Sequence, residues 1–229
     1  MNIALILAAG QGTRMDSKTP KQFLNVHGKP LLAYTIRAFE TSPSIHKIVI
    51  CAPKEFLEDV RRMVQRFHFE KVEKVICGGQ CRRESSYLGL KEIASFAKED
   101  DLVFIHDGAR ANISPDLISK NAEVARQFGV AITAIASQDT FVSKEHGYQQ
   151  VYPRGILWQV QTPQTFRFSL IWKAHQEAKN RGKDDSDDAQ LLLPEMIHFS
   201  EGSSLNFKVT TPADFQQLEQ LKKEELWTD

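Results

Sequence analysis

The N-terminal stretch IALILAAGQGTRMDSKTPK constrains the fold more than any other part of the sequence. It opens with the apolar run Ile3–Leu7, which is too short to span a membrane and suits a buried parallel strand. Small and polar residues follow, among them Gly10 and Gly12, which permit dihedrals that a Cβ would forbid and let a ligand approach the backbone. Backbone N–H groups in such a loop can surround phosphate oxygens. With Arg14 and Lys21 adding positive charge, the stretch predicts a phosphate loop with two cations.

Two common phosphate loops do not match this stretch. A dinucleotide fingerprint needs a third glycine where Met15 stands, and a Walker A loop is excluded because Gly28-Lys29 is followed by Pro30. The string LAAGQGTRM, with Pro20-Lys21-Gln22 some residues on, resembles instead the signature of nucleotidyltransferases that join a nucleoside triphosphate to a sugar or polyol phosphate.

Length and charge exclude several classes of protein. The 229 residues fit a single domain, which we expect to span residues 1–229. The formal net charge is zero, so a broad nucleic-acid footprint is not expected. No window approaches the roughly eighteen apolar residues of a membrane span, and Met1-Asn2 lacks the basic region of a signal peptide. Three cysteines without a metal-type pattern are expected as reduced thiols, in a cytoplasmic protein.

Apolar runs alternate with amphipathic stretches along the chain, which predicts an α/β layer fold with a mainly parallel sheet. The expected helices are Pro30–Phe39, Glu55–Phe67, one that begins at Ser114-Pro115 and one that begins at Thr211–Asp214. The expected strands are Ile3–Leu7, Lys47–Ala52, Lys74–Cys77, Leu102–His106, Val130–Ala136 and, bearing one lysine, Asn206–Thr210.

Two polar segments interrupt this alternation. Ser137–Val151 lies between β-like runs and is interpreted as a surface hairpin or as an arm that extends from the body. Arg181–Asp188 reads RGKDDSDD and is interpreted as a charged loop, with a solvated face and a functional role both left open.

Asp107 is the candidate metal ligand. It follows the strand Leu102–His106, and in open α/β sheets ligands bind beyond the carboxyl ends of the strands, so Asp107 and the first glycine loop should face one cleft. A carboxylate beside a triphosphate would be repelled unless it held Mg²⁺, which one or two carboxylates and phosphate oxygens typically bind. A second glycine loop, Gly78–Ser85, follows the third strand and suits contacts to a base or ribose.

The order of the motifs AAGQGTRM, TPKQF, GGQCRRESS, HDGAR, QDT, PRGILWQVQTPQTF and NFKVTTPADF over residues 8–215 resembles the 2-C-methyl-D-erythritol 4-phosphate cytidylyltransferase family. The resemblance covers nearly the whole chain. It implies a Rossmann-like nucleotidyltransferase fold, CTP as co-substrate, Mg²⁺ as cofactor, and a homodimer interlocked through a β-arm at about residues 137–158. The implied reaction is attack by a polyol-phosphate oxygen on the α-phosphate of CTP, with release of pyrophosphate.

The same resemblance implies roles for individual positions. The candidate set comprises Arg14, Lys21 and Lys208 as catalytic cations; Ala8, Ala9, Gly10, Gly12, Gly79, Gln80, Ser85, Asp107 and Gly108 as nucleotide-binding residues; Arg110, Thr140, Arg154 and Thr162 as polyol-phosphate-binding residues; and Asp107 as metal ligand. In the family, the residues matched by Thr140 and Arg154 reach across from the partner subunit.

Two positions depart from the family pattern, and three alternatives stay open. Ala111 replaces a frequent proline, and Gln80 a frequent acidic residue. In addition, the string DDSDDAQLLLP, interpreted as helical, is a looser match to the family's T-D-x-A segment. Ribitol 5-phosphate is the alternative acceptor, because ribitol-5-phosphate cytidylyltransferases carry similar motifs. A nicotinamide-dependent oxidoreductase is a second alternative, and the missing third glycine argues against it. A non-catalytic nucleotide-binding protein is a third alternative, and it would not need all the cations.

Overall fold

The computed structural model describes residues 1–10, 19–145, 148–178, 187–192 and 197–223. Gly12 and Arg14 therefore lie outside the described residues. The core is a seven-stranded sheet in the order β11-β7-β10-β6-β1-β4-β5, in which β10 runs antiparallel to β6 and β7 and the other pairs are parallel. Its strands are β1 Asn2–Leu7, β4 Lys47–Ala52, β5 Val72–Cys77, β6 Leu102–Asp107, β7 Val130–Ala136, β10 Trp158–Arg167 and β11 Phe199–Glu201.

The sheet is buried on both faces because its central strands are apolar at successive positions. In β1, Ala4 and Ile6 belong to one hydrophobic cluster, whereas Ile3 and Leu5 belong to another. Side chains of a strand alternate between faces, so a continuous apolar run supplies two cores at once. The predicted α/β fold with a mainly parallel sheet is confirmed.

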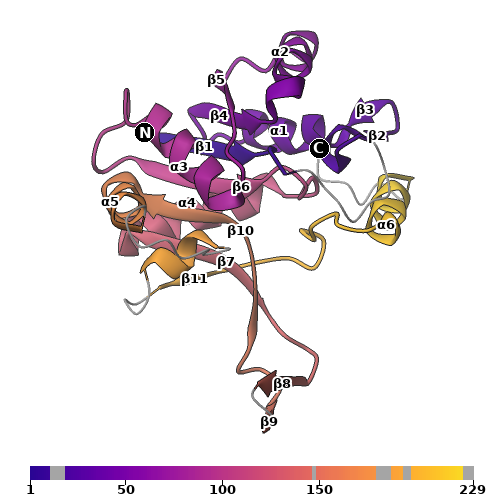
Figure 1. Ribbon diagram of the computed structural model, residues 1–229, viewed down its shortest axis with the longest axis vertical. Helices are drawn as coiled ribbons and strands as arrows, with labels where there is room; N and C mark the ends of the chain where they lie inside the picture. The colour runs from indigo at the N-terminus through magenta and orange to yellow at the C-terminus, as the bar shows by residue number, and fades with distance from the viewer. Residues whose placement is uncertain (11–18, 146–147, 179–186, 193–196, 224–229) are drawn as a thin grey trace.

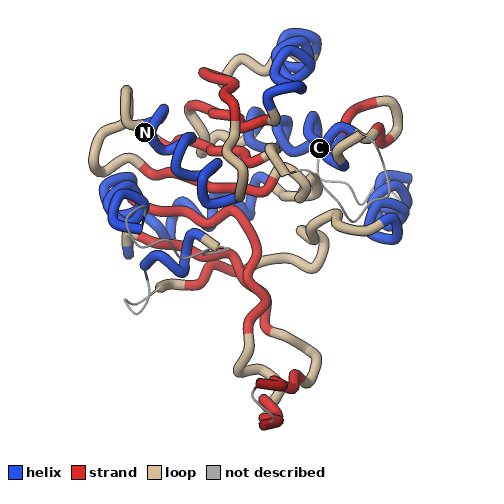
Figure 2. Tube along the Cα trace, viewed as in Figure 1, coloured by secondary structure: helices blue, strands red, loops and turns tan. Residues whose placement is uncertain are grey.

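Helices cover both faces of the sheet (Figure 2). α1 Leu31–Thr41, α2 Leu57–Arg66 and α4 Pro115–Phe128 contribute to the first cluster, and α3 Arg82–Ile93 and α5 Phe168–Ala178 to the second. α6 Pro212–Lys223 packs through Leu218 on a third, smaller cluster. The short elements are η1 Lys21–Phe23, β2 Asn25–Val26, β3 Lys29–Pro30, η2 Lys54–Phe56 and η3 Asp188–Leu192.

The ends of α4 show why its position could be predicted. The Ser114 hydroxyl accepts a hydrogen bond from Leu117 N at 3.2 Å, and Pro115 occupies the first turn, where its missing N–H costs nothing. Gly129 ends the helix at φ 82°, a left-handed conformation that glycine adopts without strain.

One predicted strand is wrong, and two strands of the seven-stranded sheet were not predicted. Asn206–Thr210 has no regular structure; Val209 N donates to Ala109 O at 2.9 Å, while the Asn206 carbonyl accepts from the side chain of Arg110. One isolated backbone hydrogen bond and one hydrogen bond from a side chain thus replace the regular ladder of a strand. The strands missed are β10 and β11; β10 contains Pro163 and shifts register between Val160 and Gln164.

A hairpin of β8 Phe141–Glu145 and β9 Tyr148–Tyr152 projects from the sheet (Figure 1). Five large apolar residues on it, in the turn that follows β9 and at the start of β10 are between 45% and 62% exposed: Phe141, Val142, Val151, Ile156 and Trp158. Because singly exposed apolar residues are common but a run of them is not, this hairpin is a candidate contact surface. Among the described helices, none has the length and apolar character to cross a membrane.

Candidate active site

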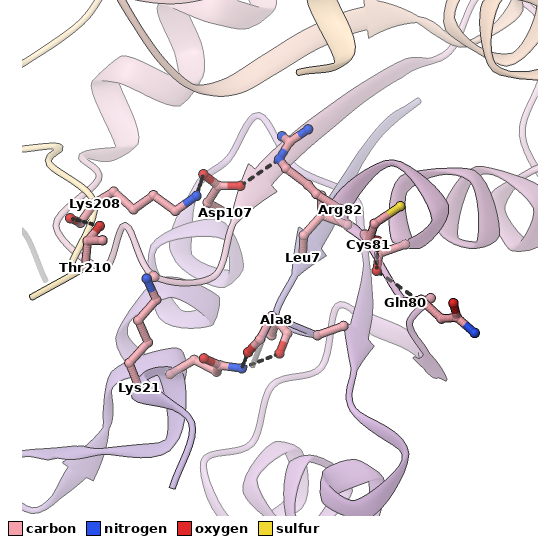
Figure 3. A pocket seen from close by; sticks show the side chains of 15 residues that line it. Leu7, Ala8, Lys21, Gln80, Cys81, Arg82, Asp107, Lys208 and Thr210 are labelled. Carbon is pink, nitrogen blue, oxygen red and sulfur yellow. Dashed lines mark hydrogen bonds and ion pairs between the residues drawn. The ribbon is translucent and has the colours of Figure 1, made fainter. Parts of the chain in front are cut away.

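A cavity of about 370 Å³ opens at the carboxyl ends of β1, β5 and β6 (Figure 3). It is lined by Leu7, Ala8, Ala9, Gly10, Lys21, Gln22, Gly79, Gln80, Cys81, Arg82, Ser85, Asp107, Ala109, Lys208 and Thr210. Two glycine loops that are far apart in sequence therefore meet Asp107 and Lys208 in one space. This is the edge of the sheet at which open α/β folds bind ligands.

The first glycine loop is held by the side chain of Gln22. This side chain is buried, and its amide nitrogen donates to Ala8 O at 2.6 Å and to Gly10 O at 2.9 Å. A Cβ on Gly10 would meet no atom of the described residues within 4 Å, and Gly10 does not adopt a positive φ. The sequence argument from special dihedrals is therefore wrong at Gly10, where the missing side chain leaves space beside the cavity instead.

The second glycine loop is fixed by the first turn of α3. Ser85 Oγ accepts from Gly79 N at 3.1 Å and donates to Cys81 O at 3.0 Å. Glu84 Oε2 accepts from Gln80 N at 2.7 Å, which leaves the Gln80 side chain exposed. The Ser85 hydroxyl therefore fixes the conformation of the loop backbone.

Asp107 is surrounded by positive charge. Its Oδ2 lies 2.8 Å from Lys208 Nζ and 3.8 Å from Arg110 Nε, and its Oδ1 lies 3.1 Å from Arg82 Nε. Burial alone would raise the pKa of Asp107, but the charges of Arg82, Lys208 and Arg110 outweigh it and hold the pKa well below its usual range. Asp107 is therefore an anion at any physiological pH.

The backbone of Asp107 is held by Thr162. Thr162 Oγ1 accepts from Asp107 N at 3.0 Å and lies 3.1 Å from His106 Nδ1, while His106 Nε2 lies 3.1 Å from Arg110 O. Burial lowers the pKa of His106 to about 4, so the ring is neutral and can donate from Nε2 while it accepts at Nδ1.

The structure separates the predicted site residues into three groups. Of the catalytic cations, Lys21 and Lys208 project into the cavity between Asp107 and Ala8 (Figure 3). Arg110 and Thr162 are buried beside Asp107 and do not line the cavity. Thr140 and Arg154 lie outside the cavity, near the base of the hairpin, where Arg154 Nε donates to Thr140 Oγ1 at 3.3 Å. Gly108 packs its backbone against Leu7 and Ala8.

Three residues of the site carry no role in the sequence interpretation. Gln22 lies within the motif TPKQF and Arg82 within the second glycine loop, but the motifs predict no function for either side chain. Asp188 ends the segment interpreted as a charged loop, yet it is 2% exposed and is paired with Arg82 and with His175. The local sequence signals charge at Asp188 but not burial, because its partners lie on other elements.

An α/β sheet whose carboxyl edge brings two glycine loops, lysines and a buried aspartate together is the architecture of a nucleotidyltransferase, and the chain is an enzyme of this class. The family model for 2-C-methyl-D-erythritol 4-phosphate cytidylyltransferase matches residues 2–223, and the chain belongs to this family. The resemblance inferred from the motifs is thereby confirmed.

Individual relatives agree with the family match. The chain is 39% identical over 217 residues to the cytidylyltransferase of that name from Clostridium perfringens, covering 93% of this chain and 94% of the relative. It is 41% identical over 214 residues to the one from Syntrophotalea carbinolica, covering 92% and 91%. A crystal structure of 4-diphosphocytidyl-2C-methyl-D-erythritol synthase from Anaerococcus prevotii superimposes with a TM-score of 0.84 at 25% identity, covering 97% and 96% of the two chains.

Proposed function

We propose that the cavity joins CTP and 2-C-methyl-D-erythritol 4-phosphate to give 4-diphosphocytidyl-2-C-methyl-D-erythritol and pyrophosphate. The observation that carries the proposal is the convergence of Lys21, Lys208 and Asp107 with both glycine loops on one cavity, in a chain of this family. A phosphate oxygen of the polyol phosphate attacks the α-phosphorus of CTP. The bond from that phosphorus to the bridging oxygen breaks, and its electron pair leaves with pyrophosphate.

Catalysis of this reaction depends on positive charge and on positioning of the substrates more than on proton transfer. The attacking phosphate oxygen is already an anion near neutral pH, so a general base is not required. The barrier is the approach of two anions and the charge that develops at five-coordinate phosphorus, which preorganised cations stabilise. The presence of Lys21 and Lys208 on the cavity wall supports this role for both, and Arg14 is proposed as a third cation from its position in the sequence.

Mg²⁺ fits the site if the triphosphate supplies most of its ligands. Among the described residues no group of three or more His, Cys, Asp or Glu side chains could hold a metal ion by itself. Asp107 offers one carboxylate at the cavity, and Mg²⁺ is commonly held by one or two carboxylates together with phosphate oxygens and water. Bound there, the ion would neutralise charge on the phosphates. Lys208 would have to release Asp107 Oδ2, whereas Arg82 contacts the other oxygen, Oδ1.

We further propose that residues 1–229 form one nucleotidyltransferase domain whose arm, at about residues 137–158, clasps a second copy. The exposed apolar side chains of the hairpin support an interface. Thr140 and Arg154 flank the hairpin and do not line their own cavity, which supports a role in the partner's site. Arg154 would there hold the phosphate of the polyol.

Subunit mixing tests the shared site. Lys21→Ala disables a chain's own cavity, whereas Arg154→Ala disables the arm that it lends. Each variant alone should be poor at low polyol phosphate, but a mixed dimer contains one site with both residues intact. Random mixing should therefore restore about a quarter of wild-type activity, since half of the dimers are mixed and half of their sites are complete. Activity that stays at the sum of the two separate variants would refute the shared site.

The acceptor is tested by measuring pyrophosphate release with CTP, Mg²⁺ and each polyol phosphate. We expect 2-C-methyl-D-erythritol 4-phosphate to give a much higher kcat/KM than D-ribitol 5-phosphate. The reverse order would assign the ribitol reaction. Release that is independent of either acceptor would indicate hydrolysis of CTP, and Lys21→Ala serves as the control for a contaminating activity.

A further inference from the structure

Arg82 links two aspartates that the sequence places far apart. From the first turn of α3, its Nε donates to Asp107 Oδ1 at 3.1 Å, and its Nη1 donates to Asp188 Oδ2. Asp107 ends β6, and Asp188 begins η3. A single rigid guanidinium therefore ties the carboxylate of the proposed metal ligand to a second, more deeply buried carboxylate.

Asp188 does not line the cavity, and its surroundings explain why it stays charged. Its side chain is 1% exposed, and its Oδ1 lies 3.0 Å from Nε2 of the equally buried His175. Burial alone would raise the pKa of Asp188, but the charge of Arg82 and the hydrogen bond from His175 outweigh it and lower the pKa. A buried carboxylate with a partner on each oxygen is a fixed anchor.

The anchor bears on the reaction through Asp107. Lys208 is 38% exposed at its side chain and can turn toward a phosphate, but the Arg82 side chain is 22% exposed and is also tethered by Asp188. Without that tether, the guanidinium could move with Asp107 and bind both of its oxygens, as arginine favours with carboxylates. With the tether, Arg82 holds one oxygen of Asp107 from one fixed direction.

We propose that Asp188 is a positioning residue of the transferase site, which acts through Arg82 to fix the orientation of the Asp107 carboxylate toward the triphosphate. The proposal rests on the proposed function, because it assigns Asp107 to the Mg²⁺–triphosphate side of the cavity. The competing interpretation is that Asp188 serves only to attach η3 to the body of the protein.

A double-mutant cycle separates these interpretations. Asp188→Asn keeps the shape and removes the charge, and Arg82→Gln removes the guanidinium. Misorientation of a reacting group costs up to roughly 10²-fold, so we expect each single variant to lose about 10- to 100-fold in kcat with smaller changes in KM. If Asp188 acts through Arg82, Asp188→Asn should cost less than about threefold in the Arg82→Gln background. The same loss in both backgrounds would overturn the proposal.

Asp101→Asn is the matched control. Asp101 is 5% exposed and pairs with the N-terminal amine, immediately before β6 and thus at the opposite end of the strand from Asp107. The Asp101→Asn variant should lose free energy of unfolding, as Asp188→Asn does, but its kcat should equal that of the wild type. If Asp188→Asn does not fold, Arg82→Lys takes its place, because the single nitrogen of lysine cannot reproduce the two fixed donor positions, Nε and Nη1, with which Arg82 holds the two aspartates. Wild-type kcat in Arg82→Lys would also overturn the proposal.

A binding measurement makes the test independent of turnover. In calorimetry without metal, the CTP affinity of Asp188→Asn should lie within about threefold of the wild-type affinity, since the glycine loops are untouched. Mg²⁺ should raise the CTP affinity of the wild type, and the same increase should be at least about fivefold smaller in Asp188→Asn. An unchanged Mg²⁺-dependent gain would refute the proposal. Wild-type protein that releases no pyrophosphate with either acceptor would instead refute the proposed function, so the two failures are distinguishable.

Discussion

Gln22→Leu removes two hydrogen bonds to the first glycine loop and little else. Leucine has nearly the volume of glutamine, and the site is 3% exposed, so the change leaves Ala8 O and Gly10 O without this donor and opens no large cavity. A net protein hydrogen bond is worth about 0.5–1.5 kcal/mol. The bond to Ala8 O is buried and the bond to Gly10 O is partly buried, so the sum lies near 2 kcal/mol.

The stability of the variant is measured by urea unfolding and by thermal melting. For a chain of this size, about 2 kcal/mol corresponds to a melting temperature roughly 4–8 °C lower. Gln65→Leu makes the same chemical change on an exposed face of α2 and should stay within about 0.5 kcal/mol of wild type. Gln22→Glu should be worse than Gln22→Leu at pH 7, because a carboxylate would face two carbonyl oxygens.

The KM for CTP shows whether these hydrogen bonds order the loop for triphosphate binding or only stabilise the fold. We expect Gln22→Leu to raise KM for CTP about tenfold, since the loop carbonyls that orient the backbone N–H groups lose their anchor. A variant as stable as Gln65→Leu would refute the hydrogen-bond argument. A destabilised variant with an unchanged KM for CTP would refute the link from Gln22 to the nucleotide.

Three further predictions address the cations, the arm and the buried histidine. Lys21→Ala should lose at least about 10²-fold in kcat, the typical cost of one preorganised donor, with circular dichroism unchanged; near-normal turnover removes it from the mechanism. Arg154→Ala should chiefly raise KM for the polyol phosphate in initial-rate kinetics, and collapsed kcat at unchanged KM contradicts its assignment. His106 has a pKa of about 4 in the folded protein and ~6.5 when unfolded, so protons bind the unfolded chain preferentially between these values. Stability should therefore fall by up to about 3 kcal/mol as pH drops from 6.5 to 4, and His106→Gln should flatten that slope in urea unfolding at a series of pH values.

Local sequence sufficed wherever a residue and its structural reason lie close together in the chain. β1 and its glycine loop are one continuous signal, and Asp107 follows an apolar strand by one histidine. Their meeting at one edge follows from the parallel pairing of β1 with β6, which a chain of alternating strands and helices favours.

Long-range pairing escaped the sequence interpretation. Lys208 was predicted as a site residue but on a strand that does not exist, because its segment is held by contacts to residues 109 and 110 and not by a ladder. Asp188 pairs with Arg82 across 106 positions, and RGKDDSDD read alone does not decide between a solvated loop and a functional one. β10 was missed since its polar residues and Pro163 weaken the strand pattern, although Gln164 and Thr165 are fully buried.

The charges of the site explain why a buried carboxylate stands among residues meant for phosphate. Without substrate, Arg82, Lys208 and Arg110 would repel one another at close range, and Asp107 offsets that repulsion. An anionic triphosphate that enters the cavity can replace Asp107 as the partner of Lys208. The backbone of Asp107 need not move, because β6 and Thr162 hold it in place. Under the proposed function, Asp107 preserves the cationic site in the folded protein, and the transfer of Lys208 from Asp107 to the ligand favours ligands that bring several negative charges.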